Sequence, residues 1–185
     1  MHTCLRFISL LLLALTLSAT PAPSVIYRVK SGSIAFRSDA PLELIQANST
    51  ELEGLMDTQR KQFAFRVRIS SFKGFNGVLQ REHFNENYME SGRFPFASFE
   101  GKVIEDIDYS QSGTYALRAR GNLTVHGVTQ ERILRVDLVV KDKIISARSA
   151  FTVLLADHNI TIPKVVHEKL ASEIKVEVKA DLLAP

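Results

Sequence analysis

The stretch EIKVEVKADL at residues 173–182 alternates charged and apolar side chains without interruption. Its apolar members are Ile174, Val176, Val178, Ala180 and Leu182. Successive side chains of a β-strand point to opposite faces, whereas a helix of this composition would spread its charges around the whole surface. The stretch therefore predicts a strand with one buried face and one face in water.

The same alternation recurs towards the N-terminus. In residues 62–70 the apolar side chains stand at odd positions and mostly polar ones stand between them. Further stretches of this kind are residues 27–30, 33–37, 42–47, 52–57, 99–107, 114–126, 134–140 and 151–155. Two short stretches, residues 78–89 and 163–171, are instead expected to be helical, the second because a proline opens it. The chain is therefore predicted to be all-β with two short helices.

Several of these strands are long, which favours a closed antiparallel β-barrel of about eight strands over a sandwich. Closure also removes the unpaired edges that a long flat strand would expose. A barrel of about eight strands is just wide enough to be filled by side chains or to hold one small ligand. Alternation alone does not separate these two cases, so a packed core and a ligand cavity both stay open.

The inward positions of the predicted strands are the candidate cavity-lining residues. They are apolar or aromatic, which suits an apolar ligand and no polar substrate. The candidates are Phe36, Phe63, Phe65, Val67, Phe99, Val103, Tyr115, Leu117, Val136, Leu138, Phe151, Val153, Ile174 and Val176.

Composition excludes several classes of function. The 185 residues suffice for one domain, and a net charge of +3 with interleaved signs makes no nucleic-acid footprint. The sequence has no G-x-S-x-G or S-x-x-K nucleophile motif, and its histidines are dispersed without an H-E-x-x-H pair. We therefore expect no enzyme activity, no metal site and no cofactor.

The first residues have the pattern of a secretory signal peptide. Arg6 precedes the apolar run 7–17, which is shorter than the roughly 20 residues that span a bilayer. Small residues follow at positions 18–22, where cleavage is expected. The predicted organisation is a signal peptide at residues 1–22 and one domain at 23–185. Because Cys4 is the only cysteine, the mature protein would hold no thiol.

The sequence GNLTVHGVT at residues 121–129 resembles the G-x-L-T-[IV]-H-G-V-T signature of the YceI-like family. Residues 93–99, with Phe94-Pro95 before Ala97-Ser98-Phe99, and residues 151–160 resemble further motifs of that family. The resemblance extends over roughly residues 25–183. One departure is His158, which stands where the family usually has an aromatic residue.

The resemblance implies an exported, lipocalin-like barrel that binds a polyisoprenoid-type lipid such as an isoprenoid quinone or a polyprenol. Its expected location is the periplasm or the medium, and transient contact with a membrane stays open. The alternative is a non-catalytic envelope interaction protein with a packed, ligand-free barrel. His126 faces away from Leu123 and Val125 by alternation, so we expect its imidazole to hold a tight turn by bonding neighbouring backbone groups.

We predict that the segment before about Ser24 is removed, because a positive residue followed by a short apolar run and small residues directs export and cleavage. N-terminal sequencing of the protein recovered outside the cytoplasm measures this. A membrane-embedded product that still begins at Met1 would contradict the prediction.

Overall fold

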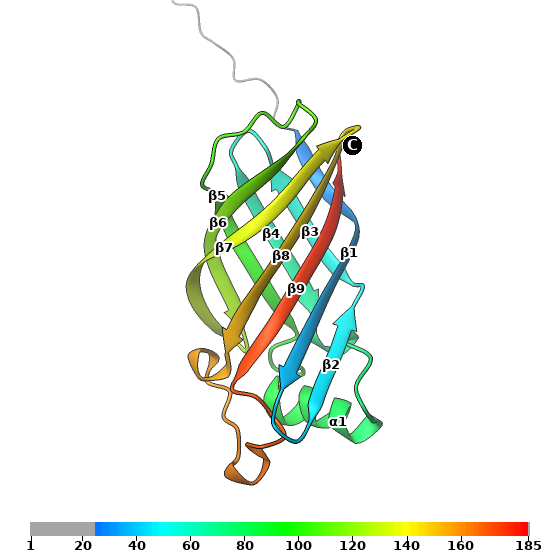
Figure 1. Ribbon diagram of the computed structural model, residues 1–185, viewed down its shortest axis with the longest axis vertical. Helices are drawn as coiled ribbons and strands as arrows, with labels where there is room; N and C mark the ends of the chain where they lie inside the picture. The colour runs from blue at the N-terminus through cyan, green and yellow to red at the C-terminus, as the bar shows by residue number, and fades with distance from the viewer. Residues whose placement is uncertain (1–24, 185) are drawn as a thin grey trace, which may run out of the picture.

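The computed structural model describes residues 25–184, which form a barrel of antiparallel strands (Figure 1). Nine strands belong to one sheet within these described residues. Their bounds are β1 Ile26–Asp39, β2 Leu44–Ser49, β3 Leu52–Asp57, β4 Gln62–Arg68, β5 Phe96–Val103, β6 Gly113–Val125, β7 Val128–Lys141, β8 Ile144–Leu154 and β9 Glu173–Leu183. The all-β class predicted from alternation is confirmed.

Pairing between β1 and β9 closes the sheet. Residues 28–37 of β1 run antiparallel to residues 175–183 of β9. The opposite edge of β1 is shared, because β3 pairs with residues 26–28 and β2 with residues 34–39. Eight strands therefore complete the circle and β2 is an extra strand beside β1, which confirms the predicted closed barrel. The two short strands expected at residues 27–37 are one continuous strand, β1, with an irregularity between Val29 and Ser31.

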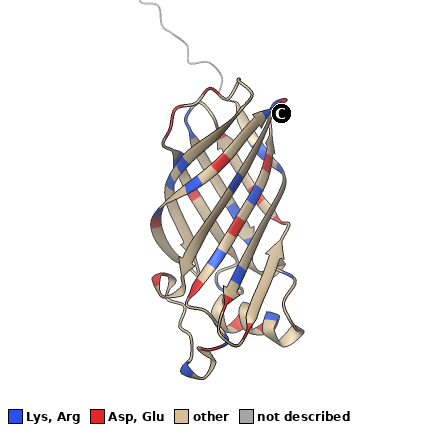
Figure 2. Ribbon diagram, in the orientation of Figure 1, with Lys and Arg blue, Asp and Glu red and all other residues tan. Residues whose placement is uncertain are grey.

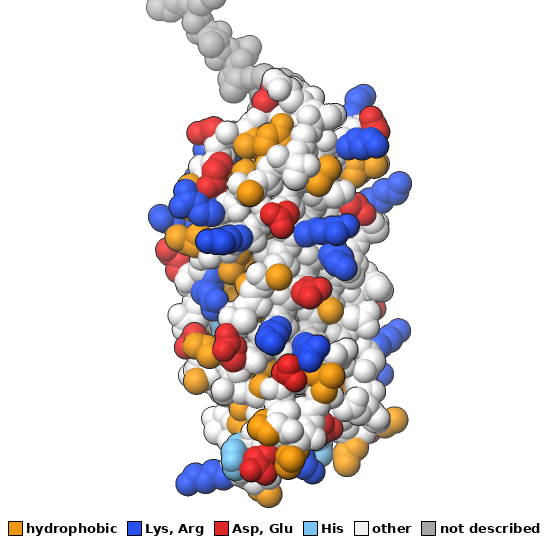
Figure 3. All heavy atoms as spheres, in the orientation of Figure 1, with side chains coloured by type: hydrophobic (Ala, Val, Ile, Leu, Met, Phe, Trp, Pro, Cys, Tyr) orange, Lys and Arg blue, Asp and Glu red, His pale blue; other side chains and the backbone are white. Residues whose placement is uncertain are grey.

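The wall sorts its side chains as the period of two requires. On β9, Ile174, Val176 and Leu182 are buried, and the intervening Glu, Lys and Asp side chains are exposed. Figure 2 shows these charges alternating in sign along β9, and Figure 3 shows both signs mixed over the outer wall of that face. The exterior is thus hydrated, and the apolar side chains have only the interior to occupy.

A pair of glycines lets β5 and β6 approach closely. Gly101 and Gly121 are register partners on these strands. A Cβ built on Gly101 would lie 2.1 Å from the Arg120 carbonyl oxygen, and one on Gly121 would lie 2.2 Å from the Glu100 carbonyl oxygen. Any side chain at either position would therefore push the two backbones apart. The strands can bend tightly at this point because neither residue carries one.

The loop between β5 and β6 packs over one end of the barrel. Its Ile107 and Tyr109 pack against the core together with Tyr115 of β6. The Tyr109 hydroxyl is buried and has no hydrogen-bond partner among the described residues. Burial, with a smaller contribution from the charge of Asp106, raises the pKa of Tyr109 to about 12. The phenol is therefore neutral at ordinary pH, as suits an apolar plug.

The helical segments lie at the other end. The α-helix α1 spans Val78–His83 and continues into the π-helical turn η2 at Phe84–Tyr88, which matches the helix expected at residues 78–89. Single 3-10 turns are η1 Ile69–Ser71, η3 Leu155–His158 and η4 Lys164–Val166. The helix expected at 163–171 is wrong, since only η4 forms there. Adjacent β-branched valines disfavour an α-helix, and the Leu42 amide hydrogen-bonds the Glu168 carbonyl at 2.9 Å, which ties the segment to the β1–β2 hairpin.

Candidate functional site

A cavity of about 580 Å³ occupies the end of the barrel that α1 covers. The strands β1, β4, β5, β6, β8 and β9 form its wall, while α1, η2 and the segment after β8 form its cover. The cavity reaches the surface between the β1–β2 hairpin, α1 and the 163–171 segment, where its lining includes exposed Gly77 and Lys169. We call this opening the mouth.

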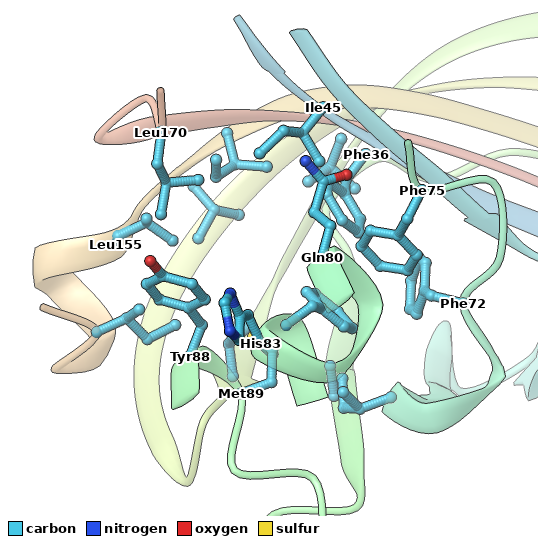
Figure 4. A pocket seen from close by; sticks show the side chains of 18 of the residues that line it. Phe36, Ile45, Phe72, Phe75, Gln80, His83, Tyr88, Met89, Leu155 and Leu170 are labelled. Atoms are coloured by element: carbon cyan, nitrogen blue, oxygen red, sulfur yellow. The ribbon is translucent and has the colours of Figure 1, made fainter. Parts of the chain in front are cut away.

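Four phenylalanines fix the cover to the wall. Phe84 of η2 stacks on Phe36 of β1 with ring centroids 5.3 Å apart. Phe72 and Phe75 precede α1 in sequence and contact both of these rings at 5.0 to 5.9 Å. Aromatic pairs at such separations add about 0.5–1.5 kcal/mol each beyond their burial. The cluster therefore holds the helical segment over the cavity (Figure 4).

Most polar side chains of the first cavity lie at its mouth. Gln80 of α1 donates through Nε2 to Glu43 Oε1 at 2.8 Å, and its own Oε1 accepts from the Asn76 amide at 3.0 Å. These bonds latch α1 to the β1–β2 hairpin. His83 and Lys169 also line the mouth. In Figure 4, Gln80 and His83 extend from α1 into a space otherwise bounded by Leu155, Leu170 and Ile45.

A second cavity of about 140 Å³ continues the first one deeper into the barrel. Both are lined by the same set of side chains where they meet, namely Ile34, Val67, Ala97, Leu123 and Phe151. On β9, Ile174 lines the first cavity and Leu182 the second. At a rise of about 3.3 Å per residue and a strand tilt of about 40°, the eight steps between them correspond to roughly 20 Å along the barrel axis. Two adjacent cavities with mainly apolar linings thus follow one another along the barrel axis.

Thirteen of the fourteen candidate residues line these two cavities. Those at the first cavity are Phe36, Val67, Phe151, Val153, Ile174 and Val176, and those at the second are Phe63, Phe65, Val67, Phe99, Val103, Leu117, Val136, Leu138 and Phe151. Tyr115 lines neither cavity. It packs near the β5–β6 loop, where its hydroxyl donates to the Gln111 carbonyl at 3.2 Å. Its face is the expected one, but it lies beyond the hollow part of the barrel.

The alternation of the strands did not predict the residues that cover the cavity. Residues that line it from outside the strands include Phe72, Phe75, Phe84, Met89, Leu155, Ile160 and Leu170. Irregular segments carry no fixed period, so alternation does not reveal which of their side chains point inward. A weak signal was present in Phe84 and Tyr88, which are four residues apart on the expected helix and so share a face.

The described residues contain neither a cluster of metal ligands nor a membrane-spanning helix. Across residues 25–184, no group of three or more His, Cys, Asp or Glu side chains is placed to hold a metal ion. No helix within that range is long and apolar enough to cross a membrane.

Comparison with known proteins places this barrel in a family. The family model for the YceI-like domain matches residues 30–182. The chain belongs to the YceI-like family. No curated protein matches the sequence.

Solved structures share the YceI-like fold at low identity. A polyisoprenoid binding domain from Saccharophagus degradans, implicated in plant cell wall breakdown, is 12% identical with a TM-score of 0.74, over 87% of this chain and 99% of that one. Burkholderia cenocepacia BcnA is 9% identical with a TM-score of 0.67, over 81% and 95%. The Campylobacter jejuni YCEI protein is 14% identical with a TM-score of 0.60, over 76% and 85%. At these identities the likeness concerns the fold.

His126, in the stretch that resembles the YceI-like signature, connects three segments that are distant in sequence. With Gly127 it forms the two-residue turn between β6 and β7, and both residues have positive φ. Its Nδ1 donates to the His158 carbonyl at 3.1 Å, and its Nε2 lies 3.2 Å from Glu90 Oε1. Both partners are acceptors, so the ring makes both bonds when each nitrogen carries a proton. The expected bond to a backbone group is present, but that group belongs to the distant His158 and the second partner is the Glu90 side chain.

His158, which stands where YceI-like proteins usually have an aromatic residue, is fully buried. Its Nδ1 donates to the Val128 carbonyl at 3.0 Å, and its Nε2 has no partner among the described residues. The imidazole thus replaces a ring in the core and adds one bond from η3 to the start of β7.

Truncating Phe151 to alanine should destabilise the lipid-free protein less than truncating Phe63. Phe63 is 7% exposed and packs on Phe99 with centroids 5.0 Å apart, so Phe63→Ala should cost the usual ~3–5 kcal/mol for a buried aromatic. Phe151 faces both cavities, whereas Phe63 faces only the smaller, deeper one, so the Phe151 ring has fewer packing contacts to lose. Urea unfolding of both variants measures the difference, and an equal loss of unfolding free energy would mean that the interior is filled.

Proposed function

We propose that this protein binds one lipid with a long apolar chain inside its barrel, and that the chain is polyisoprenoid. The observation that carries the proposal is the mainly apolar lining of the two adjacent cavities. Burial of apolar surface contributes about 25 cal/mol per Å². A prenyl chain that buries several hundred Å² would therefore gain several kcal/mol even after the cost of ordering it.

The head group of this lipid would lie at the mouth. Glu43, Gln80, His83 and Lys169 line the first cavity there, whereas the surface that faces the deeper cavity is almost wholly apolar. A polar head group placed deeper would lose its hydrogen bonds to water without replacement, which is unfavourable by several kcal/mol. An isoprenoid quinone or a polyprenol has the required shape, with one small polar end and a long chain.

The comparisons support the class of ligand. The Saccharophagus degradans neighbour is described as a polyisoprenoid binding domain, and 99% of its length aligns with this chain. Because one fold can serve several functions, the support from the neighbour counts only together with the shape of the cavity. We propose a binding role and not a catalytic one.

We further propose that the protein works outside the cytoplasm, in the periplasm or the medium. The motive is the signal-like pattern of residues 1–22, which lie outside the described residues. Residues 23–185 would then be the mature lipid-binding domain.

The purified protein should contain a prenyl lipid, which organic extraction and mass spectrometry would identify. Added isoprenoid quinone or polyprenol should raise the thermal midpoint as RT ln(1 + [L]/Kd) predicts for a ligand of the native state. Val153→Arg, which puts a charge in the wall of the first cavity, should abolish both effects.

Two further variants make this test specific. Val139→Arg on the exposed outer face of β7 adds the same charge and should keep the lipid. Ala97→Phe fills the junction of the two cavities with an apolar ring, so it should weaken binding without a buried charge. If the native protein holds no lipid and none of the added prenyl lipids shifts its midpoint, the rival function of an envelope interaction protein takes over.

We also propose that the mouth contacts a membrane transiently while lipid is taken up. Four large apolar side chains around it, Leu42, Val78, Leu79 and Val165, are 62% to 88% exposed. They belong to the β1–β2 hairpin, α1 and η4, which are joined by the Gln80–Glu43 and Leu42–Glu168 hydrogen bonds. Exposed apolar groups that surround an apolar opening favour contact with lipid.

Replacing two of these side chains with charges should slow uptake from a membrane. The double variant Val78→Asp, Val165→Asp should take up a polyprenol from phosphatidylcholine vesicles roughly tenfold more slowly or worse, since each inserted valine is worth about 1.5 kcal/mol or more. Val139→Asp, on the outer wall, is the matched control. Equal uptake rates for the unmodified protein, the double variant and the control would show that the mouth does not contact the membrane. As a check on binding itself, all three proteins should bind lipid delivered in detergent.

A further inference from the structure

The strands β7 and β8 are joined along only part of their length. Within residues 25–184, ladder pairs connect residues 137–141 of β7 to residues 144–148 of β8. Beyond them, residues 128–136 and 149–154 belong to the same two strands but have no ladder pairs with each other. We call this stretch the seam, and Figure 1 shows the two strands diverging from their joined ends. By contrast, β6 is paired with β7 along its whole length, and β8 with β9 along its whole length.

Side chains take the place of the missing ladder. Four hydrogen bonds join a side chain on one side of the seam to a carbonyl oxygen on the other. They are Ser149 Oγ to Arg135 O at 2.7 Å, Arg132 Nη2 to Thr152 O at 2.9 Å, Gln130 Nε2 to Asp157 O at 2.8 Å, and His158 Nδ1 to Val128 O at 3.0 Å. All of these bonds except that of the fully buried His158 can break by rotation of one side chain, with no change in the register of a strand.

Apolar side chains lie on both the inner and the outer surface of the wall at the seam. Leu134 and Val136 of β7 and Phe151 of β8 line the deeper cavity immediately behind it. On the outer surface, Ile133 of β7 is 50% exposed and Leu154 of β8 is 45% exposed. A hydrocarbon chain that crossed the wall here would pass from one apolar surface to another.

We propose that the seam is a lateral port through which the prenyl chain enters and leaves the barrel. The inference rests on the proposed lipid-binding function. The mouth opens to the surface, but the four-phenylalanine cluster and the Gln80–Glu43 bond fix its width, so through the mouth the chain could leave only end first. Passage through the seam requires the four side-chain bonds to release and the two strands to move apart, but no ladder bond between β7 and β8 has to break there. A flexible chain can then leave sideways along its length, and the ladders on both outer edges of the two strands remain intact.

Chemical cross-linking tests the port, because Cys4 is the only cysteine and precedes the expected cleavage site. Ile133→Cys and Thr152→Cys, on opposite sides of the seam, are joined by a short dithiol-reactive linker. Transfer of a fluorescently labelled geranylgeraniol from the protein to vesicles should then slow roughly tenfold or more, since rates depend exponentially on the barrier. The control pair Val139→Cys, Ser146→Cys lies where the ladder is intact, and its cross-link should leave the rate unchanged.

Variants that lack a hydrogen bond across the seam should change the transfer rate in the opposite direction. Arg132→Ala and Ser149→Ala each remove one bond across the seam and should speed transfer, whereas Arg135→Ala removes an arginine side chain of the same strand that makes no such bond. A cross-link between Glu43→Cys and Gln80→Cys closes the mouth. If that cross-link alone arrests transfer, or if the seam cross-link has no effect, the lateral port is refuted.

Organic extraction of bound lipid from the same proteins distinguishes failure of the lateral port from failure of the lipid-binding function. Bound lipid with equal transfer rates in the seam and control pairs would overturn the port and keep the lipid-binding function. Absence of bound or bindable prenyl lipid in the unmodified protein would overturn both.

Discussion

The antiparallel pairing of β1 with β9 is the constraint on which the interior depends. A sheet with one apolar face must cover it, and residues 25–184 form no second layer of strands or helices long enough to do so. Closing the sheet on itself covers that face, and the diameter of an eight-stranded circle then decides how much space the inward side chains leave. The long β1 makes closure possible, because one edge contacts β9 while the other is divided between β2 and β3. The cavity is what remains after closure.

The sequence predicts which side chains face the interior of the barrel better than it predicts where along the barrel axis the cavities lie. Alternation assigned Phe63, Val67 and Val176 to the interior because the period of two is a local property of a strand. Tyr115 has the correct face and no cavity beside it, since position along the barrel axis depends on register between strands. The cover formed by residues 72–89 and 155–170 has no fixed period, so its inward side chains become visible only in the folded chain.

The motifs that resemble the family converge in space at the lower end of the seam. The turn at His126 and Gly127 belongs to one motif, and His158 belongs to another that follows some thirty residues later. Two hydrogen bonds join the motifs: His126 donates to the His158 carbonyl, and His158 donates to the carbonyl of Val128, two residues after His126. Neither bond could be inferred from spacing alone. Part of this signature therefore fixes the position of η3 against the start of β7, where strand pairing supplies no bonds.

A container for a lipid must exclude water and still release its contents. A complete ladder around the barrel would satisfy the first requirement and oppose the second, because backbone bonds along two strands open cooperatively. Gln130 and Arg132 lie on the same face of β7 as buried Leu134, where polar side chains are unfavourable unless they find partners. Their partners are carbonyl oxygens of residues 152 and 157, which have no ladder bonds to β7. The missing ladder between β7 and β8 thus explains why two polar side chains occur on this face of β7. Their hydrogen bonds close the wall at the seam, and rotation of a single side chain can open each of them.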